Sequence, residues 1–186
     1  MSDPKRVLVP LAEGFEEIEA VAIVDVLRRA EVEVVVAGLT SRRVVGAHGM
    51  ALEADALLAE VDATTFDMLV LPGGMPGTVH LLEDERVLAA VRELHARGRT
   101  TAALCAAPRV LATAGVLAGR EVTSHPSVRG MLAPAEVRAN PRVIRSGTIV
   151  TSQGPGTAIE FALELVRELA GHERAEALAA GMIVSA

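Results

Sequence analysis

Short apolar runs alternate with amphipathic stretches along almost the whole chain, and this alternation restricts the fold more than any other feature. The runs at residues 7–10 and 68–71 have the length of buried strands, whereas residues 15–30 and 85–97 have the spacing of helices. Strands and helices that alternate in this way build a mostly parallel sheet with helices on both faces. We therefore predict an α/β three-layer sandwich, formed by a single domain over residues 1–186 without repeats or linkers.

The other predicted elements follow the same pattern. Asp84 is suited to cap the helix at 85–97, and Gly98 and Gly115 are suited to end helices. We expect a β-hairpin over residues 43–54 that turns at residues 47–49. The remaining strands are predicted at residues 33–37, 100–104, 121–124, 143–146 and 148–152, and the remaining helices at residues 106–114, 158–169 and 172–180.

Composition argues against several classes of function. The net charge is -6, and the chain has no Trp, no Tyr and three Phe, so a nucleic-acid partner is not expected. The five histidines and the single cysteine show no metal-ligand spacing. No apolar run approaches the ~18 residues that a membrane span requires. With a polar start that does not resemble a secretory signal and one cysteine, we expect a cytoplasmic protein without an internal disulfide.

Cys105, the only cysteine, falls between the strand predicted at 100–104 and the helix predicted at 106–114. A side chain at this junction lies at the carboxyl end of a strand, where open α/β sheets bind ligands. The N–H groups and dipole of the following helix would stabilise a thiolate, so we expect a lowered cysteine pKa and a nucleophile. The alternative is an inert buried cysteine that acts as a small hydrophobe. The position, more than the residue type, favours function.

Three further groups are candidates for the same site. Glu19 has apolar helical neighbours at Phe15, Ala22, Ile23 and Val26, which predicts an inward carboxyl group with a raised pKa that can exchange protons with Cys105. Gly73 and Gly74 follow the strand at 68–71, and they can form either an ordinary turn or an oxyanion hole. His125 ends a predicted strand and is a candidate partner for Cys105, although a loop histidine is more often a solvated surface group.

Two other segments give weaker signals. Residues 154–157, Gly-Pro-Gly-Thr, lack the lysine and the spacing of a phosphate-binding loop, so we interpret them as a tight turn before the helix at 158–169. His48 lies at the tip of the predicted hairpin, where a functional role is less expected.

Four segments in order resemble the ThiJ/PfpI superfamily. They are residues 7–19 (VLVPLAEGFEEIE), residues 71–74 (LPGG), residues 103–108 (ALCAAP) and residues 151–157 (TSQGPGT). The resemblance runs nearly end to end and implies a flavodoxin-like fold, a homodimer and a nucleophile elbow at Cys105. By position it implies that Glu19 hydrogen-bonds to the cysteine, that Gly74 and Ala106 supply oxyanion-hole N–H groups, and that His125 lies nearby.

The resemblance also suggests what the protein does. Members of the superfamily are glutathione-independent glyoxalases, deglycases that act on early methylglyoxal and glyoxal adducts, or oxidation-sensing chaperones. Ala106 replaces the histidine that follows the cysteine in the protease-like branch, and no histidine here has the His-x-Glu spacing of the amidotransferase relatives, so we expect neither activity. His48 stands where relatives often have Arg.

The leading hypothesis is therefore a cysteine-dependent deglycase or glyoxalase. Its substrates would be small reactive aldehydes or glycated protein and amine adducts, and it would need no cofactor. The alternatives are a non-enzymatic redox-sensing chaperone with an oxidisable Cys105 and a structural dimer with an inert cysteine.

Overall fold

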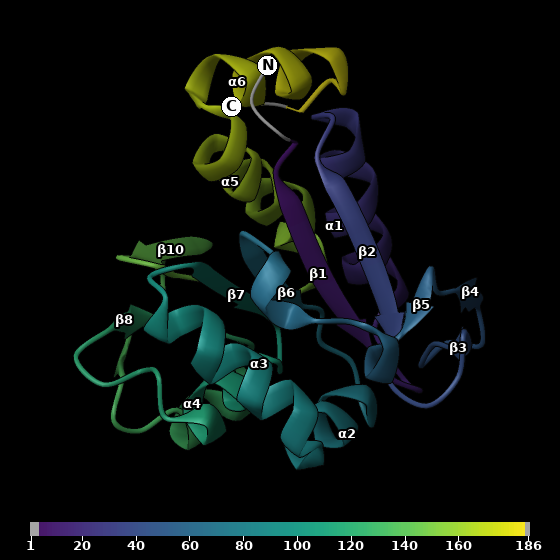
Figure 1. Cartoon of the computed structure of the whole chain (residues 1–186). Coiled ribbons are helices and arrows are strands. Elements are labelled where there is room, and N and C mark those ends of the chain that lie inside the picture. Colours follow the sequence, from purple (N-terminus) through teal and green to yellow (C-terminus); the bar gives the residue numbers. More distant parts are fainter. Residues whose placement is uncertain (1–3, 185–186) are drawn as a thin grey trace.

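The computed structural model describes residues 4–184 and has one central seven-stranded sheet (Figure 1). The strand order is β10-β11-β7-β6-β1-β2-β5, in which β10 runs antiparallel to β11 and the other neighbours are parallel. The predicted three-layer α/β architecture is confirmed. The strands are β1 (Arg6–Leu11), β2 (Glu33–Gly38), β5 (Ala56–Leu57), β6 (Met68–Leu71), β7 (Thr100–Leu104), β10 (Val143–Ser146) and β11 (Ile149–Ser152).

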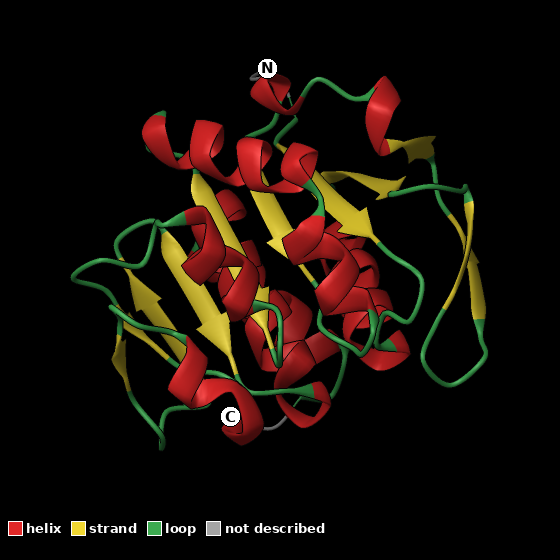
Figure 2. Cartoon of the chain, turned by 90° about the horizontal axis from the view of Figure 1, so that it is seen from below, coloured by secondary structure: helices red, strands yellow, loops and turns green. Residues whose placement is uncertain are grey.

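Helices cover both faces of this sheet (Figure 2). Consecutive residues of a strand point to opposite faces, so Val7 and Val9 pack in the core beneath α1 and α5, whereas Leu8 packs in the core beneath α3 and α4. One layer contains α1 (Glu17–Arg29) and α5 (Ala158–Ala170), with α6 (His172–Gly181) packed on α5; the other contains α2 (Gly77–Glu83), α3 (Glu85–Ala96) and α4 (Pro108–Ala114).

The smaller elements lie outside the central sheet. The predicted hairpin is present as β3 (Arg43–Val45) and β4 (Ala51–Glu53). A second small sheet pairs β8 (Glu121–Val122) with β9 (Glu136–Val137). Single 3₁₀ turns occupy Leu58–Glu60, Ala63–Thr65, Pro126–Met131 and Pro155–Thr157.

Some predicted boundaries were wrong. The strand predicted to reach Ser124 ends at Val122, because the next N–H, that of Thr123, donates to the Thr151 hydroxyl instead of continuing a ladder. The helix predicted from residue 106 begins at Pro108, because Cys105 turns the chain sharply first. Helix α2 was not predicted; it has only seven residues and begins with glycine, so it shows too little apolar spacing to detect.

The sheet has its topological switch point between the neighbouring strands β1 and β6. The chain leaves β1 toward β2 on one side, and it leaves β6 toward β7 on the other. Ligands of open α/β sheets bind in the crevice beyond the carboxyl ends of such strands. Glu19 follows β1, Gly73 follows β6 and Cys105 follows β7, so the order of the strands brings these three residues to one place.

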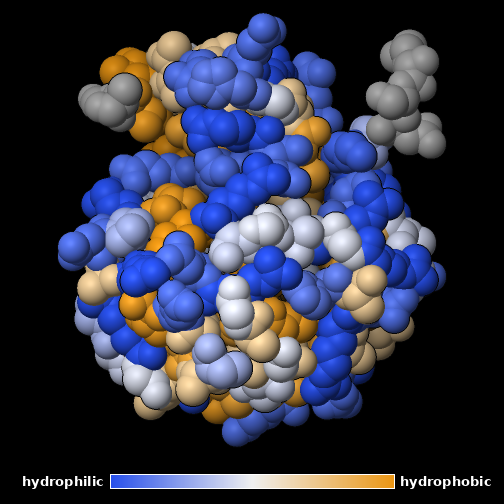
Figure 3. Space-filling view, turned by 90° about the vertical axis from the view of Figure 1, so that its left-hand side faces the viewer, coloured by the Kyte–Doolittle hydropathy of each residue, from blue (hydrophilic) through white to orange (hydrophobic). Residues whose placement is uncertain are grey.

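The surface is mostly polar. On the face drawn in Figure 3, apolar side chains form separate patches between charged ones. Within residues 4–184, no helix combines the length and the apolar character needed to span a membrane.

Candidate active site

Cys105 occupies a strained turn directly after β7. Its φ angle is 60°, a left-handed conformation that residues other than glycine rarely adopt. The turn is fixed on both sides: the Cys105 N–H donates to the Ser152 carbonyl at 3.0 Å, and the Cys105 carbonyl accepts from the His125 N–H at 2.9 Å. Strain of this kind, imposed by surrounding hydrogen bonds, is concentrated at functional sites. The predicted strand-to-helix junction is confirmed, and the side chain is only partly buried.

Glu19 points inward from the first turn of α1, as its apolar neighbours predicted, and is fully buried. Its Oε2 accepts the N–H of Gly73 at 2.7 Å, and its own N–H donates to Oε2 of Glu16 at 2.7 Å. Its Oε1 accepts no hydrogen bond from a nitrogen or oxygen atom within residues 4–184, and the Cys105 thiol lies beside the carboxyl group. Burial raises the pKa of Glu19 to about 7, against the opposing effect of the Gly73 N–H.

The pKa of Cys105 corrects the expectation of a lowered value. Burial, followed by the charge of an ionised Glu19, raises the pKa of the thiol to about 12, and the Ala106 N–H lowers it by less than these effects raise it. The expectation of a lowered pKa considered the N–H groups and dipole of the helix after Cys105, but not repulsion from an ionised Glu19. Between about pH 7 and about pH 12 the two groups therefore hold one proton between them, and a thiolate forms when that proton is on Glu19.

The loops that follow β6 and β7 bring backbone N–H groups to the site, but not all of these groups are available to a substrate. The Gly73 N–H already donates to Glu19, so Gly73 positions the carboxyl group and does not bind a substrate oxygen as expected. In the described part of the chain, the N–H groups of Gly74 and Ala106 donate to no backbone or side-chain oxygen. Gly74 has φ of 103°, and a Cβ there would lie 2.3 Å from the Glu16 nitrogen, so this position requires glycine.

His125 lies at the site through its backbone and presents an exposed ring. Its Nδ1 accepts the Ser127 N–H at 3.3 Å and contacts the Ser127 hydroxyl at 2.7 Å. A ring nitrogen that accepts an N–H is unprotonated, so the neutral ring carries its proton on Nε2. The strand expected to end at His125 stops earlier, and His125 instead caps the 3₁₀ turn that begins at Pro126.

Gly154 is a site residue that the sequence analysis missed. A Cβ at this position would lie 4.0 Å from Sγ of Cys105 and 3.9 Å from Cδ2 of His125. The segment was interpreted only as a tight turn. It lies at the site because it follows β11, whose neighbour in the sheet is β7, and no local pattern in the sequence shows this pairing.

His48 and Glu17 fasten the β3–β4 loop to α1. The carboxylate of Glu17 accepts the His48 N–H at 2.6 Å and contacts Nδ1 of His48 at 2.8 Å. This hydrogen bond raises the pKa of His48, and it lowers that of Glu17 although burial acts in the opposite direction. Together with Glu16 they are close enough to hold a metal ion. However, the positive end of the α1 dipole lies here and these hydrogen bonds already engage Glu17, which disfavours a cation.

Comparisons with known proteins agree with this geometry. The model of the DJ-1/PfpI family matches residues 5–168. Protein dj-1beta of Drosophila melanogaster is 41% identical over 183 residues, which cover 97% of this chain and 98% of the relative. A Caenorhabditis elegans relative, named glutathione-independent glyoxalase DJR-1.2, is 36% identical over 180 residues, which cover 96% of each chain.

Solved structures show the same fold. The crystal structure of Drosophila melanogaster DJ-1beta superposes with a TM-score of 0.95 at 41% identity, covering 99% of this chain and 100% of that one. An oxidized Toxoplasma gondii DJ-1 gives a TM-score of 0.93 at 41% identity, covering 98% of this chain and 100% of the other. The flavodoxin-like fold is therefore confirmed, and the chain belongs to the DJ-1/PfpI family.

Proposed function

We propose that this protein is a cysteine-dependent enzyme that converts 2-oxoaldehydes such as methylglyoxal and glyoxal to 2-hydroxy acids without glutathione. The observation that carries the proposal is the fully buried carboxyl group of Glu19 beside the Cys105 thiol, with the N–H groups of Gly74 and Ala106, which donate to no protein oxygen among the described residues. A buried carboxyl group with a pKa near neutrality can both give and take a proton at physiological pH. The relative named as a glyoxalase supports the same substrate class.

The reaction begins when the Cys105 thiolate adds to the aldehyde carbon of methylglyoxal. A C–S bond forms, and the carbonyl oxygen becomes an alkoxide that accepts hydrogen bonds from Gly74 and Ala106 and takes the proton of Glu19. The Glu19 carboxylate then removes the hydrogen from the former aldehyde carbon as a proton while the neighbouring carbonyl oxygen takes up a proton, which gives an enediol. Glu19 returns its proton to the neighbouring carbon, and the hydroxyl group on the sulfur-bearing carbon loses its own proton. This converts the hemithioacetal to a thioester without an external oxidant, and water then releases lactate and restores the thiol.

The residues that carry out the first step, Cys105 and Glu19, also suit early adducts of these aldehydes. An aldehyde already bound to an amine or a thiol presents a carbon with a hydroxyl group. Cys105 would form a C–S bond to that carbon as the bond to the amine or thiol breaks, and Glu19 would donate the proton that the leaving nitrogen or sulfur takes up. We therefore include deglycation of protein and amine adducts in the proposal.

A second candidate is oxidation sensing by Cys105. Oε1 of Glu19 accepts no hydrogen bond from a nitrogen or oxygen atom of the described residues, and the Ala106 N–H points toward the sulfur. Two equivalents of peroxide would oxidise the thiolate to a sulfinate and form two water molecules, and a protonated Glu19 could donate to a sulfinate oxygen. The solved structure of an oxidized Toxoplasma relative makes this candidate relevant.

We also propose that the protein is a homodimer. Ile18 and Val21 on α1 are 60% and 44% exposed, and Ile159 on α5 is 44% exposed. They line one hollow of ≈ 610 Å³ together with Met182. Exposed apolar side chains gathered on adjacent helices mark an interaction surface.

The deciding experiment is steady-state loss of methylglyoxal without glutathione, followed as lactate, for the wild type, Cys105→Ser and Glu19→Gln. Many turnovers per site that both substitutions abolish would support the enzyme. Loss of less than one equivalent, with Cys105 converted to sulfinic acid under mild peroxide, would reject the enzyme and favour the sensor.

A further inference from the structure

Gly154 leaves an open space beside the reactive sulfur. A Cβ on Gly154 would meet Sγ of Cys105 at 4.0 Å and the ring of His125 at 3.9 Å, which are ordinary van der Waals distances. The backbone there is extended, with φ of 163° and ψ of -168°. Neither the backbone nor a steric clash therefore requires glycine at this position, in contrast to Gly74. The absence of a side chain at residue 154 leaves space beside the Cys105 sulfur that part of a substrate can occupy.

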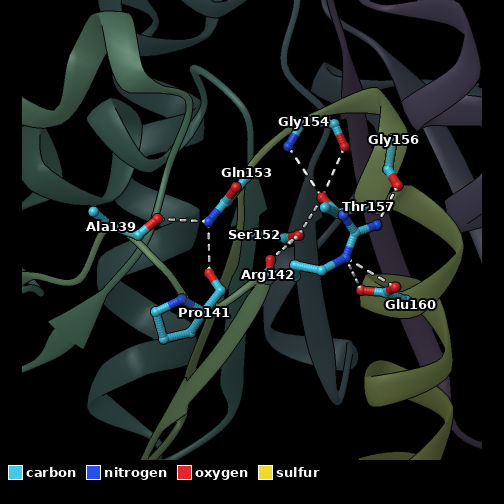
Figure 4. Close-up of polar contacts among 9 residues, drawn as sticks. All are labelled: Ala139, Pro141, Arg142, Ser152, Gln153, Gly154, Gly156, Thr157 and Glu160. Atoms are coloured by element: carbon cyan, nitrogen blue, oxygen red, sulfur yellow. Dashed lines mark hydrogen bonds and ion pairs between the residues drawn. The ribbon is translucent and has the colours of Figure 1, made fainter. Parts of the chain in front are cut away.

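Hydrogen bonds hold Gly154 in place (Figure 4). The Thr157 hydroxyl accepts the Gly154 N–H at 3.1 Å and donates to the Gly154 carbonyl at 2.8 Å. The same hydroxyl contacts Oγ of Ser152 at 2.6 Å, and both Thr157 and Ser152 are buried. A buried network of this kind keeps its members rigid. The gap beside the sulfur therefore has a fixed width.

A second set of contacts ties the loop to the preceding segment (Figure 4). Nε2 of Gln153 donates to the carbonyls of Ala139 and Pro141 at 2.9 and 2.8 Å. Arg142 donates through Nη2 to the Gly156 carbonyl at 2.6 Å, and its Nε donates to the Glu160 carboxylate. The loop is restrained on both sides of Gly154, so it cannot move aside easily for a larger group.

The chemistry of the proposed reaction assigns an occupant to this gap. When the thiolate adds to a 2-oxoaldehyde R–CO–CHO, the new oxygen lies against the N–H groups of Gly74 and Ala106. A Cβ on Gly73 would lie 2.8 Å from Cβ of Cys105, and Glu19 lies beside the thiol, so this side of Cys105 is filled. On the side of Gly154 a Cβ would be in ordinary contact with the sulfur and with the His125 ring. The R–CO group is therefore left with the side that Gly154 opens.

We propose that Gly154 is the specificity-determining residue of this site, and that the space in place of its side chain admits the R group of 2-oxoaldehydes larger than glyoxal. The identity of the substrate rests on the proposed function, whereas the effect of residue 154 on access to the Cys105 sulfur does not. A methyl group added at residue 154 would fill part of the gap and lie in ordinary contact with Sγ of Cys105 and the His125 ring, without a steric clash.

The test compares Gly154→Ala with Gly156→Ala on glyoxal, methylglyoxal and phenylglyoxal. Gly156 lies in the same loop, and a Cβ there would meet nothing within 4 Å, so it controls for the loss of a glycine. We expect Gly154→Ala to lower the kcat/KM ratio of phenylglyoxal to glyoxal by about tenfold or more, with methylglyoxal in between. Gly156→Ala should leave this ratio at the wild-type value. An equal change for all three aldehydes would overturn the proposal.

A second readout separates this proposal from the proposed function. Alkylation of Cys105 by iodoacetamide and by its bulkier N-phenyl derivative requires no turnover, and the rate ratio is internal to each variant. Gly154→Ala should slow the N-phenyl reagent at least about fivefold more than iodoacetamide, as expected for one added methyl group in a fixed gap. If no aldehyde is turned over but this ratio shifts, the proposed function fails while the role of Gly154 in access to the sulfur is upheld. An unchanged ratio rejects the role of Gly154 whatever the turnover.

Discussion

The backbone N–H of Gly73 donates to Oε2 of Glu19 at 2.7 Å, so the loop after strand β6 holds the carboxyl group that lies against Cys105. The two residues are 54 positions apart in the sequence. Glu19 is thereby fixed at both ends, by its place in the first turn of α1 and by this contact. A carboxyl group held in this way keeps its orientation toward the sulfur whether or not it carries a proton.

Glu19→Gln should change how stability depends on pH. The pKa of Glu19 is raised from 4.5 to about 7 in the folded protein, so the folded state binds more protons than the unfolded state between these values. The contribution of Glu19 to the free energy of unfolding is therefore fully present below pH 4.5. It is lost as the pH rises toward 7, by an amount on the order of 3 kcal/mol. Denaturant unfolding from pH 4.5 to 8 should show this fall in the wild type and much less of it in Glu19→Gln.

The matched control for this measurement is Glu83→Gln. Glu83 is an exposed carboxyl group on α2, so its substitution should leave the pH dependence of unfolding as in the wild type. A pH dependence that persists in Glu19→Gln would show that another group produces it.

The same substitution should alter the reactivity of Cys105. An ionised Glu19 raises the pKa of the Cys105 thiol, whereas a glutamine side chain carries no charge. We expect Glu19→Gln to react with iodoacetamide about tenfold or more faster at pH 7.5, with the difference diminishing at high pH, where the wild-type thiol also ionises. Slower alkylation of the variant at pH 7.5 would show instead that Glu19 acts on Cys105 mainly as the base that takes its proton.

The fold and the centre of the site could be predicted because their signals are local. Strand and helix alternation appears in windows of a few residues, Cys105 lies at a visible junction, and the apolar neighbours of Glu19 show that it points inward. The expectation of an oxyanion hole after β6 stays a prediction. It did not distinguish Gly73, whose N–H is committed to Glu19, from Gly74, whose N–H is not.

The parts that could not be predicted depend on the order of the strands. Gly154 lies beside Cys105 only because β11 pairs with β7, and no local pattern records that pairing. The raised pKa of Cys105 arises from burial and from a carboxylate that a different strand and helix bring to it. The expectation from the sequence considered only the effect of the helix end after Cys105, and it therefore predicted a lowered pKa.

Gly73→Ala should disturb the site by steric contact. An added Cβ would lie 2.8 Å from Cβ of Cys105 and 2.8 Å from Oε2 of Glu19, closer than packed side chains allow. We expect a loss of about 1–3 kcal/mol in the free energy of unfolding. We also expect faster alkylation of Cys105, because a displaced Glu19 carboxylate raises the pKa of the thiol less. Gly156→Ala is the control, because it adds a methyl group where there is room. Wild-type stability and reactivity in Gly73→Ala would contradict the close packing described here.

His125→Ala tests whether the exposed ring takes part in proton transfer. The ring borders the gap at Gly154, and its Nδ1 is held by Ser127. If Nε2 passes a proton to or from the substrate oxygen, kcat for methylglyoxal should fall by about a hundredfold with a smaller change in KM. Ser127→Ala keeps the ring but frees its orientation, so it should lower kcat by less and shift its pH profile. A change in KM alone would indicate that His125 only shapes the site.

Ile18→Glu tests the proposed dimer. Ile18 is 60% exposed on α1 and lines the same hollow as Val21 and Ile159, so a carboxylate there would have to be desolvated in any interface built on these helices. We expect light scattering to give a dimer for the wild type and a monomer for Ile18→Glu at micromolar concentration. Met131→Glu is the matched control, because Met131 is 57% exposed but lies on the 3₁₀ turn after His125 and does not line this hollow. A wild-type dimer that Met131→Glu disrupts and Ile18→Glu does not would place the interface on the opposite layer of the sandwich.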